Sequence, residues 1–228
     1  MQVIELDQSY CDRYLIIAFD PGFYNWGYSI IDAMVINDQL YMDIAETGHV
    51  SLVNKIKDTF TNIPLKGIEL LHQEILKKLC SILHYNPYDA NYRTLLDVKL
   101  VMGVENCFMD SRLAALSGMV VGRFMDLCQN RITYITPSAW RKSVGFTRYC
   151  SLKAPGTELK RTSIMMARIL ENCTNNEHSL IRNDHIADSV CLGMAVIKLY
   201  INNEQAYINF INNIHHKYDE QQQQQQCQ

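Results

Sequence analysis

The chain lacks the patterns that mark several common classes of protein. None of its eight cysteines has the CxxC spacing of a zinc finger or a thioredoxin-type redox site. It contains no P-loop and no GxGxxG fingerprint, so nothing supports nucleotide-driven chemistry. No run of about 18 apolar residues could span a membrane, and the first residues carry acids (Glu5, Asp7 and Asp12) in place of the apolar core of a secretory signal. We therefore expect a protein with no membrane segment and no nucleotide cofactor, whose thiols stay unpaired in a reducing intracellular compartment.

A large net charge is also missing, but the charge is unevenly distributed. The chain carries −3 overall, whereas residues 131–170 carry eight Lys or Arg against one acid, Glu158; this segment is therefore +7 and the remainder −10. Trp140, Phe146 and Tyr149 are interleaved with these cations. Because neutralised phosphates supply much of the affinity for nucleic acids, and aromatic rings stack on unpaired bases, the segment is predicted to bind nucleic acid. Its basic residues are Arg131, Arg141, Lys142, Arg148, Lys153, Lys160, Arg161 and Arg168.

Hydrophobic patterns predict a mixed α/β domain. With 228 residues, 48% of them apolar, the chain can bury a substantial core in one large domain or two small ones. Three consecutive strands joined by short turns imply an antiparallel start to the sheet. Strands and amphipathic helices then alternate, and the six-glutamine tract at 221–226 predicts a disordered tail. The predicted strands span 14–20, 25–32, 39–49, 98–105 and 132–135, and the predicted helices span 66–84, 110–129, 136–140, 158–170 and 183 or 184 to about 200.

The helix predicted at 110–129 is rich in small residues. Gly118 and Gly122 lie in its interior, where glycine costs about 0.5–1 kcal/mol relative to alanine. Close approach of another backbone, for instance from a second subunit, would offset that cost.

Acidic residues stand at the ends of two apolar strands and at the start of a helix. Asp20 and Glu105 each end an apolar run. Asp184, His185 and Asp188 open the last long helix, where the spacing of three puts His185 and Asp188 on one side. Carboxylate oxygens are the hard ligands that Mg²⁺ and Mn²⁺ prefer. The sequence therefore predicts a divalent-metal site assembled from distant parts of the chain.

Each of these acids, taken alone, also has an ordinary structural explanation. Asp20 precedes Pro-Gly and could belong to a turn, Glu105 could begin a loop, and Asp184 could be a helix N-cap. Their coincidence at three element boundaries favours the metal site. Two metal ions can activate a water and stabilise the leaving oxygen in phosphodiester hydrolysis, with Asp20 on a central strand as the natural bridging ligand.

These motifs resemble those of the poxvirus Holliday junction resolvases, which are relatives of the bacterial RuvC resolvases within the RNase H-like nuclease superfamily. The resemblance covers roughly residues 13–200. The segment Arg112–Arg123 is similar to the dimer-interface helix of these enzymes. The motifs that carry the resemblance are Phe19-Asp20-Pro21-Gly22 with Asn25-Trp26-Gly27, Val104-Glu105-Asn106, Asp184-His185-Ile186-Ala187-Asp188-Ser189, and, for the DNA-contacting region, Thr136-Pro137-Ser138 with Lys142, Gly156 and Lys160-Arg161.

The resemblance implies an α/β, RNase H-like (RuvC-type) fold: a five-stranded mixed sheet whose first three strands are antiparallel, with helices on both faces. It also implies a homodimer that binds branched DNA and cuts four-way (Holliday) junctions by paired metal-dependent nicks that leave 5′-phosphates. Such an enzyme would resolve viral genome concatemers in the cytoplasm of the infected host cell. The expected organisation is an N-terminal extension (1–13), the nuclease domain (14–212) and a disordered Gln-rich tail (213–228).

The resemblance also implies roles for individual residues. Asp20, Glu105 and Asp188 match metal ligands for two Mg²⁺ ions per site, which Mn²⁺ could replace. The fourth ligand is His185 or Asp184, a choice that the sequence leaves open. Lys160 or Lys153 would contact the reacting phosphate. The catalytic set is thus Asp20, Glu105, Asp188, His185 and Lys160, and the DNA-binding set is Arg141, Lys142, Arg148, Lys153, Lys160 and Arg161.

Two other functions remain compatible with the sequence. An RNase H-like ribonuclease that cuts RNA in hybrids would share the metal chemistry but needs only one site, so a monomer would favour it. A non-catalytic scaffold that binds branched DNA would have lost its ligands, whereas at least three are present here.

Overall fold

A mixed sheet lies at the centre of the computed structural model, which describes residues 12–22, 26–50, 65–83, 98–106, 110–129, 131–173 and 180–226. Its five strands follow the order β3-β2-β1-β4-β5. The first three pair in antiparallel fashion, whereas β4 pairs parallel to both β1 and β5. This confirms the predicted sheet. The strands are β1 (Asp12–Asp20), β2 (Trp26–Ile36), β3 (Gln39–Val50), β4 (Val98–Glu105) and β5 (Ile132–Ile135).

The central position of β1 follows from its sequence. Every residue from Tyr14 to Asp20 is buried, as expected of a strand that is covered on both faces. The hairpin that joins β2 to β3 turns at Asn37 and Asp38, both with positive φ (48° and 60°). This is the conformation that a two-residue hairpin turn requires and that Asn and Asp tolerate well.

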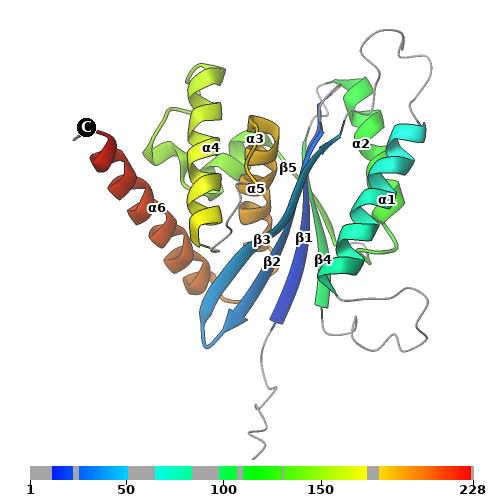
Figure 1. Ribbon diagram of the computed structural model, residues 1–228, viewed down its shortest axis with the longest axis horizontal. Helices are drawn as coiled ribbons and strands as arrows, with labels where there is room; N and C mark the ends of the chain where they lie inside the picture. Colours follow the sequence, from blue (N-terminus) through cyan, green and yellow to red (C-terminus); the bar gives the residue numbers. More distant parts are fainter. Residues whose placement is uncertain are drawn as a thin grey trace, which may run out of the picture.

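Helices cover both faces of the sheet (Figure 1). On one face, α1 (Leu65–Ile82) and α2 (Ser111–Phe124) enclose one apolar cluster with β1, β2 and β4. On the other face, α5 (Asp184–Ile197) packs directly on β1 and β2 and is covered in turn by α4 (Gly156–Cys173). The short α3 (Pro137–Ser143) contacts α5, and α6 (Glu204–Gln226) contacts β3 and α4.

The prediction of a disordered tail is wrong for residues 213–226, which continue α6. Ala206, Tyr207, Ile211, Ile214 and Tyr218 recur at helical spacing and are buried, so the helix is held by an apolar face. Glutamine itself has a good helix propensity. The predicted long helix from 184 also ends earlier, at residue 197. Residues 1–11 and 227–228 lie outside the described residues.

The small-residue helix begins as predicted, because the Asp110 carboxylate accepts hydrogen bonds from the backbone N–H groups of Arg112 (3.0 Å) and Leu113 (3.3 Å). Gly118 and Gly122 are exposed, and a Cβ added at either would meet no described atom within 4 Å. Close packing against the described part of this chain therefore does not explain these glycines.

The remaining expectations concern membranes and thiols. No helix in the described ranges has the length and apolar character that crossing a membrane requires. The cysteines whose side chains the structure describes, Cys80, Cys128, Cys150 and Cys191, all carry free thiols.

Candidate active site

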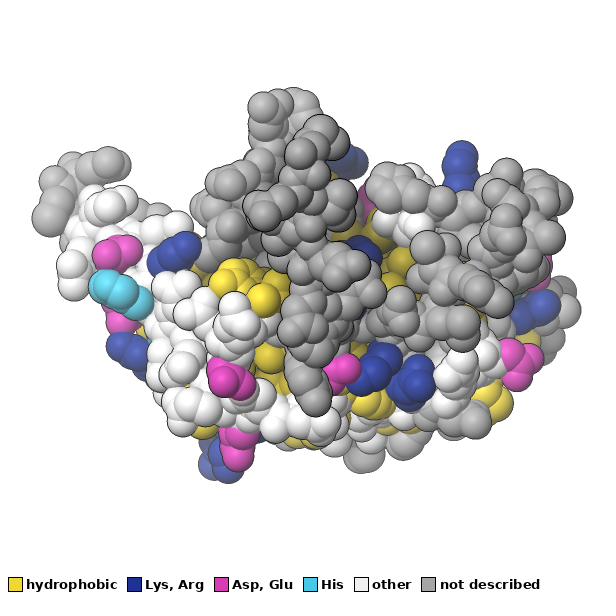
Figure 2. All heavy atoms as spheres, turned by 90° about the horizontal axis from the view of Figure 1, so that it is seen from below, with side chains coloured by type: hydrophobic (Ala, Val, Ile, Leu, Met, Phe, Trp, Pro, Cys, Tyr) yellow, Lys and Arg dark blue, Asp and Glu magenta, His cyan; other side chains and the backbone are white. Residues whose placement is uncertain are grey.

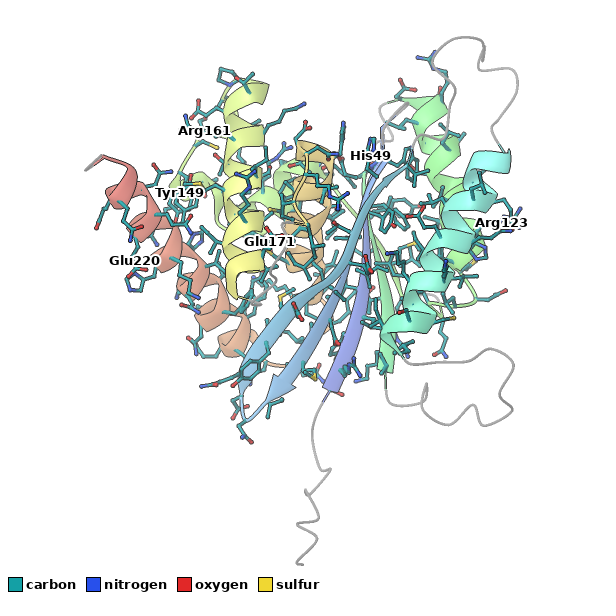
Figure 3. All side chains as sticks on the ribbon, viewed as in Figure 1. His49, Arg123, Tyr149, Arg161, Glu171 and Glu220 are labelled. Atoms are coloured by element: carbon teal, nitrogen blue, oxygen red, sulfur yellow. The ribbon has the colours of Figure 1, made fainter. Side chains whose placement is uncertain are left out.

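The predicted acidic residues meet at one end of the sheet. Asp20 and Glu105 end the adjacent parallel strands β1 and β4, and the carboxyl ends of parallel strands share an edge. The N-terminus of α5 reaches the same edge, because His185 lies against the start of β2. Figure 3 shows His49, near the end of β3, at this end of the molecule as well. The fold thus assembles the cluster that the sequence predicts.

Asp20 is the buried centre of this cluster. It is 8% exposed, and the Nδ1 atom of His185 lies 2.8 Å from its Oδ2 atom. Burial raises the pKa of Asp20, although the hydrogen bond from His185 opposes the shift. The same hydrogen bond raises the pKa of His185. The ring of His185 stacks beside that of His49, with centroids 6.4 Å apart.

Asp184 faces a different partner. Its carboxylate pairs with the Lys160 ammonium of α4. Burial raises the pKa of Asp184, but the Lys160 contact and the charge of His185 together outweigh it, and the pKa lies below its ordinary value. Of the two candidates for a fourth ligand, the geometry therefore puts His185 against Asp20 and Asp184 against a cation.

Glu105 and Asp188 complete the acidic cluster. Burial and the charge of Asp20 raise the pKa of Glu105 to about 7 and that of Asp188 to about 6. The Trp140 indole donates to Glu105 with an Nε1–Oε2 distance of 2.7 Å. The buried Oδ1 atom of Asp188 has no hydrogen-bond partner among the described residues.

Arg141 brings a positive charge to the same cluster. Its guanidinium carbon lies 4.7 Å from the centre of the Trp140 ring, and its buried Nε has no partner in the described part of the chain. The Arg141 charge opposes the rise in pKa at Asp20, Glu105 and Asp188. This half-buried residue therefore acts on the acids rather than lying on an exposed surface.

The chemistry of these donors fits a divalent cation. Among the described residues, no group of three or more His, Cys, Asp or Glu side chains is arranged to hold a metal ion as it stands. The buried Asp20 and the half-buried Glu105 and Asp188 disfavour one another's ionisation, and one oxygen of Asp188 has no partner among the described residues, so together they form a site that a hard cation would stabilise. Asp20, Glu105, Asp188 and His185 are the residues that would hold it.

The raised pKa of Glu105 predicts a pH-dependent gain in stability for Glu105→Gln. The folded-state pKa is about 7 against an ordinary value of 4.5, so ionisation destabilises the folded protein progressively between these pH values and fully above them. Without metal, the variant should exceed the wild type by roughly 2–3 kcal/mol at pH 8 and match it near pH 4.5. Urea denaturation in EDTA at both pH values measures this. An equal difference at both would contradict the origin in ionisation.

The predicted DNA-binding residues other than the half-buried Arg141 are exposed, but two of them are already paired with acids. Lys142 on α3 and Lys153 are exposed, as are Lys160 and Arg161 in the first turns of α4, where Figure 3 shows Arg161. Arg148 ends the 3₁₀ helix η2 (Phe146–Arg148) and binds Asp219 of α6 at 2.5 Å. At the opposite end of the sheet, several of the visible Lys and Arg side chains lie close to Asp and Glu (Figure 2).

The predicted role of the aromatic residues in base stacking is wrong for Trp140 and Phe146. Both are fully buried and form an edge-to-face pair with centroids 5.4 Å apart. The Tyr149 ring is also engaged within the fold, since it stacks on the ring of Tyr218 of α6 with centroids 3.8 Å apart. Figure 3 shows Tyr149 between α4 and α6. Aromatic residues in this segment therefore stabilise the fold around the basic side chains.

Sequence reasoning named Trp140 and Gly27 but did not predict their roles in the site. The hydrogen bond between Trp140 and Glu105 joins residues that are 35 positions apart in the sequence, so no local sequence pattern predicts it. Gly27 carried a usable signal, because glycine inside a strand often marks close backbone approach. A Cβ at Gly27 would lie 2.2 Å from the His185 carbonyl oxygen.

Comparison with known proteins yields structural neighbours alone, since neither a family model nor a curated protein matches the sequence. RuvC of Thermus thermophilus has a TM-score of 0.50 at 12% identity, and the match covers 82% of this chain and 94% of that one. The same enzyme in complex with a Holliday junction substrate gives the same score and identity, covering 82% and 93%. The fowlpox virus Holliday junction resolvase has 14% identity and covers 82% and 99%, but its TM-score of 0.43 is too low to carry an argument.

The two RuvC structures and the strand order define the class of fold. The chain has an RNase H-like α/β fold, as predicted. One solved neighbour in that class, at a TM-score of 0.50, is the bacterial resolvase RuvC.

Proposed function

We propose that this protein is a metal-dependent endodeoxyribonuclease that resolves four-way DNA junctions. The observation that carries the proposal is the cluster of Asp20, Glu105 and Asp188 at the sheet edge, next to the exposed cations at the start of α4. The fold that holds this cluster is shared with RuvC, which has been solved with a Holliday junction substrate. Acids that bind a cation and basic residues that bind the polyanion together suit phosphodiester hydrolysis.

In this proposal, some residues of the site bind the metal ions and others contact the DNA. Two Mg²⁺ ions, or Mn²⁺ in their place, would supply an activated water and stabilise the leaving oxygen when bound. Asp20, Glu105 and Asp188 provide the hard oxygen ligands. His185 is oriented by its hydrogen bond to Asp20, and Lys160, which pairs with Asp184, would contact the reacting phosphate.

The finer features extend this proposal. Paired nicks require two sites, and a two-fold dimer matches a two-fold junction. The exposed face of α2 with Gly118 and Gly122 could let a second copy approach closely. The motifs further suggest a poxvirus-type enzyme that leaves 5′-phosphates and resolves genome concatemers in the cytoplasm of the infected cell.

Cleavage of a synthetic four-way junction tests the proposal. The junction, a linear duplex and an RNA–DNA hybrid are incubated with the protein in Mg²⁺, Mn²⁺ or EDTA. Symmetrical, metal-dependent nicks in the junction alone are expected. Cutting of the hybrid would indicate a ribonuclease, and junction binding without cutting in either metal would indicate a scaffold.

The ion pair between Arg148 and Asp219 provides a test of the basic surface. Replacing Asp219 by Asn releases the guanidinium, so junction affinity should rise about 2–5-fold at low salt, the scale of an exposed ion pair. Glu220→Gln is the matched control, because it removes the same charge from α6 but leaves the Arg148 pair in place. Fluorescence anisotropy in EDTA measures both. Equal effects of the two variants would exclude Arg148 from the DNA contact.

A further inference from the structure

Trp140 is buried and nevertheless makes a polar contact through its indole N–H. The residue is 0% exposed, yet its indole N–H reaches the Glu105 carboxylate at 2.7 Å. A buried N–H that donates to a carboxylate is a short, charge-assisted hydrogen bond. It fixes one of the two oxygens of Glu105 and with it the rotation of the whole carboxylate.

The helix that carries Trp140 is firmly anchored. Thr136 caps α3 by accepting a hydrogen bond from the Ala139 N–H at 3.3 Å, and Pro137 occupies the first turn. The indole packs edge-to-face on Phe146, and α3 contacts α5. Trp140 therefore presents its N–H from a rigid position that also borders the helix bearing Asp188.

Arg141 covers the same indole. Its guanidinium carbon lies 4.7 Å from the ring centre, within the range of a cation–π contact. Consecutive residues of α3 thus reach the acidic cluster in two ways, one through a hydrogen bond to Glu105 and the other through a positive charge.

We propose that Trp140 is a positioning residue for Glu105, which it holds in the orientation that a divalent cation requires. This inference rests on the proposed function for its consequence, since the cation is the one that serves cleavage. Partners that orient metal ligands typically contribute roughly 10- to 100-fold in metal affinity or activity.

The chain offers a direct reporter of this contact. It contains two tryptophans, so a ¹⁵N–¹H spectrum shows two indole resonances. Trp26 is also fully buried, but it belongs to the apolar cluster on the other face of the sheet, and its Nε1 has no partner among the described residues. The Trp26 resonance is therefore the internal reference, and the loss of one peak in Trp140→Phe assigns the other.

Two comparisons of this spectrum test the inference. Glu105→Gln should move the Trp140 resonance before any metal or DNA is added, and leave that of Trp26 in place. Mg²⁺ should then shift the Trp140 resonance in the wild type and not in Glu105→Gln. A Trp140 resonance unchanged by Glu105→Gln overturns the positioning role whether or not the protein cuts DNA, so this failure is distinct from failure of the nuclease assay.

Matched variants supply the second readout. Trp140→Phe should weaken Mn²⁺ binding by isothermal titration calorimetry about tenfold and lower the kcat for the junction with little change in KM. Trp26→Phe removes the same indole from the opposite face and should leave Mn²⁺ affinity unchanged. Equal losses in the two variants would show that only general stability had been affected, and would overturn the proposal.

Discussion

Replacing Asp20 by Asn is expected to abolish junction cleavage, by at least about 10³-fold, while junction binding persists. Asp20 lies at the centre of the acidic cluster, is 8% exposed and contacts His185. The amide keeps the size of the side chain but removes the charge that would bind a cation. The exposed cations of α3 and α4 are untouched, so the affinity for phosphates should not fall. Cleavage in Mg²⁺ and anisotropy in EDTA measure the two effects separately.

Asp32→Asn is the matched control for this experiment. Asp32 lies on β2, pairs with Leu15 in the sheet and binds Arg13 at 2.5 Å, away from the acidic cluster. Its amide variant should lose some stability and keep its activity. Normal cleavage by Asp20→Asn would refute the assignment of the site, and loss of junction binding would show that the substitution had damaged more than the metal ligand.

The second large effect is expected from Gly27→Ala. The added methyl would lie 2.2 Å from the His185 carbonyl oxygen, which belongs to the backbone and cannot rotate away. The N-terminus of α5 must therefore move away from β2 and carry His185 with it. Overpacking of this kind costs about 1–3 kcal/mol, and a displacement of about 1 Å in a catalytic group can lower activity about 100-fold. Cleavage rates at a temperature where the variant is fully folded measure the catalytic part.

Gly48→Ala separates displacement from destabilisation. Its methyl would also be too close to a neighbour, 2.3 Å from the Tyr28 ring, but that ring belongs to the cluster on the other face of the sheet. We expect a similar loss in denaturation midpoint with a much smaller loss in rate. If both variants lose the same activity, the position of α5 is not what Gly27 protects.

Much of the fold could be predicted because the signals are local. The apolar run that ends in Asp20 behaves as a central strand, and β4 and β5 have the predicted bounds. The convergence of Asp20 and Glu105 follows from topology, since parallel strands end at one edge, whereas the start of α5 reaches that edge through the contact of His185 with Gly27. The metal ligation and the roles of these residues stay predictions.

The errors arose where tertiary contacts decide the outcome. Residues 213–226 look disordered by composition, yet Ile214 and Tyr218 are buried in the core and extend α6 to the glutamine tract. Trp140 appeared suited to stacking on DNA because it neighbours Arg141 and Lys142. Whether an aromatic side chain faces inward depends on the packing of α3 against α5, which no short sequence window contains.

The burial of α5 determines when the acidic cluster loses its geometry as the protein unfolds. From Ile186 to Ile197 this helix is almost entirely enclosed between the sheet and α4, and its first turn carries Asp184 and His185. Local openings of a protein begin in segments with few buried contacts, not in such a helix. The part of the acidic cluster that α5 carries is thus displaced only when the core opens. Its geometry should persist up to the cooperative unfolding transition and then disappear with the whole domain.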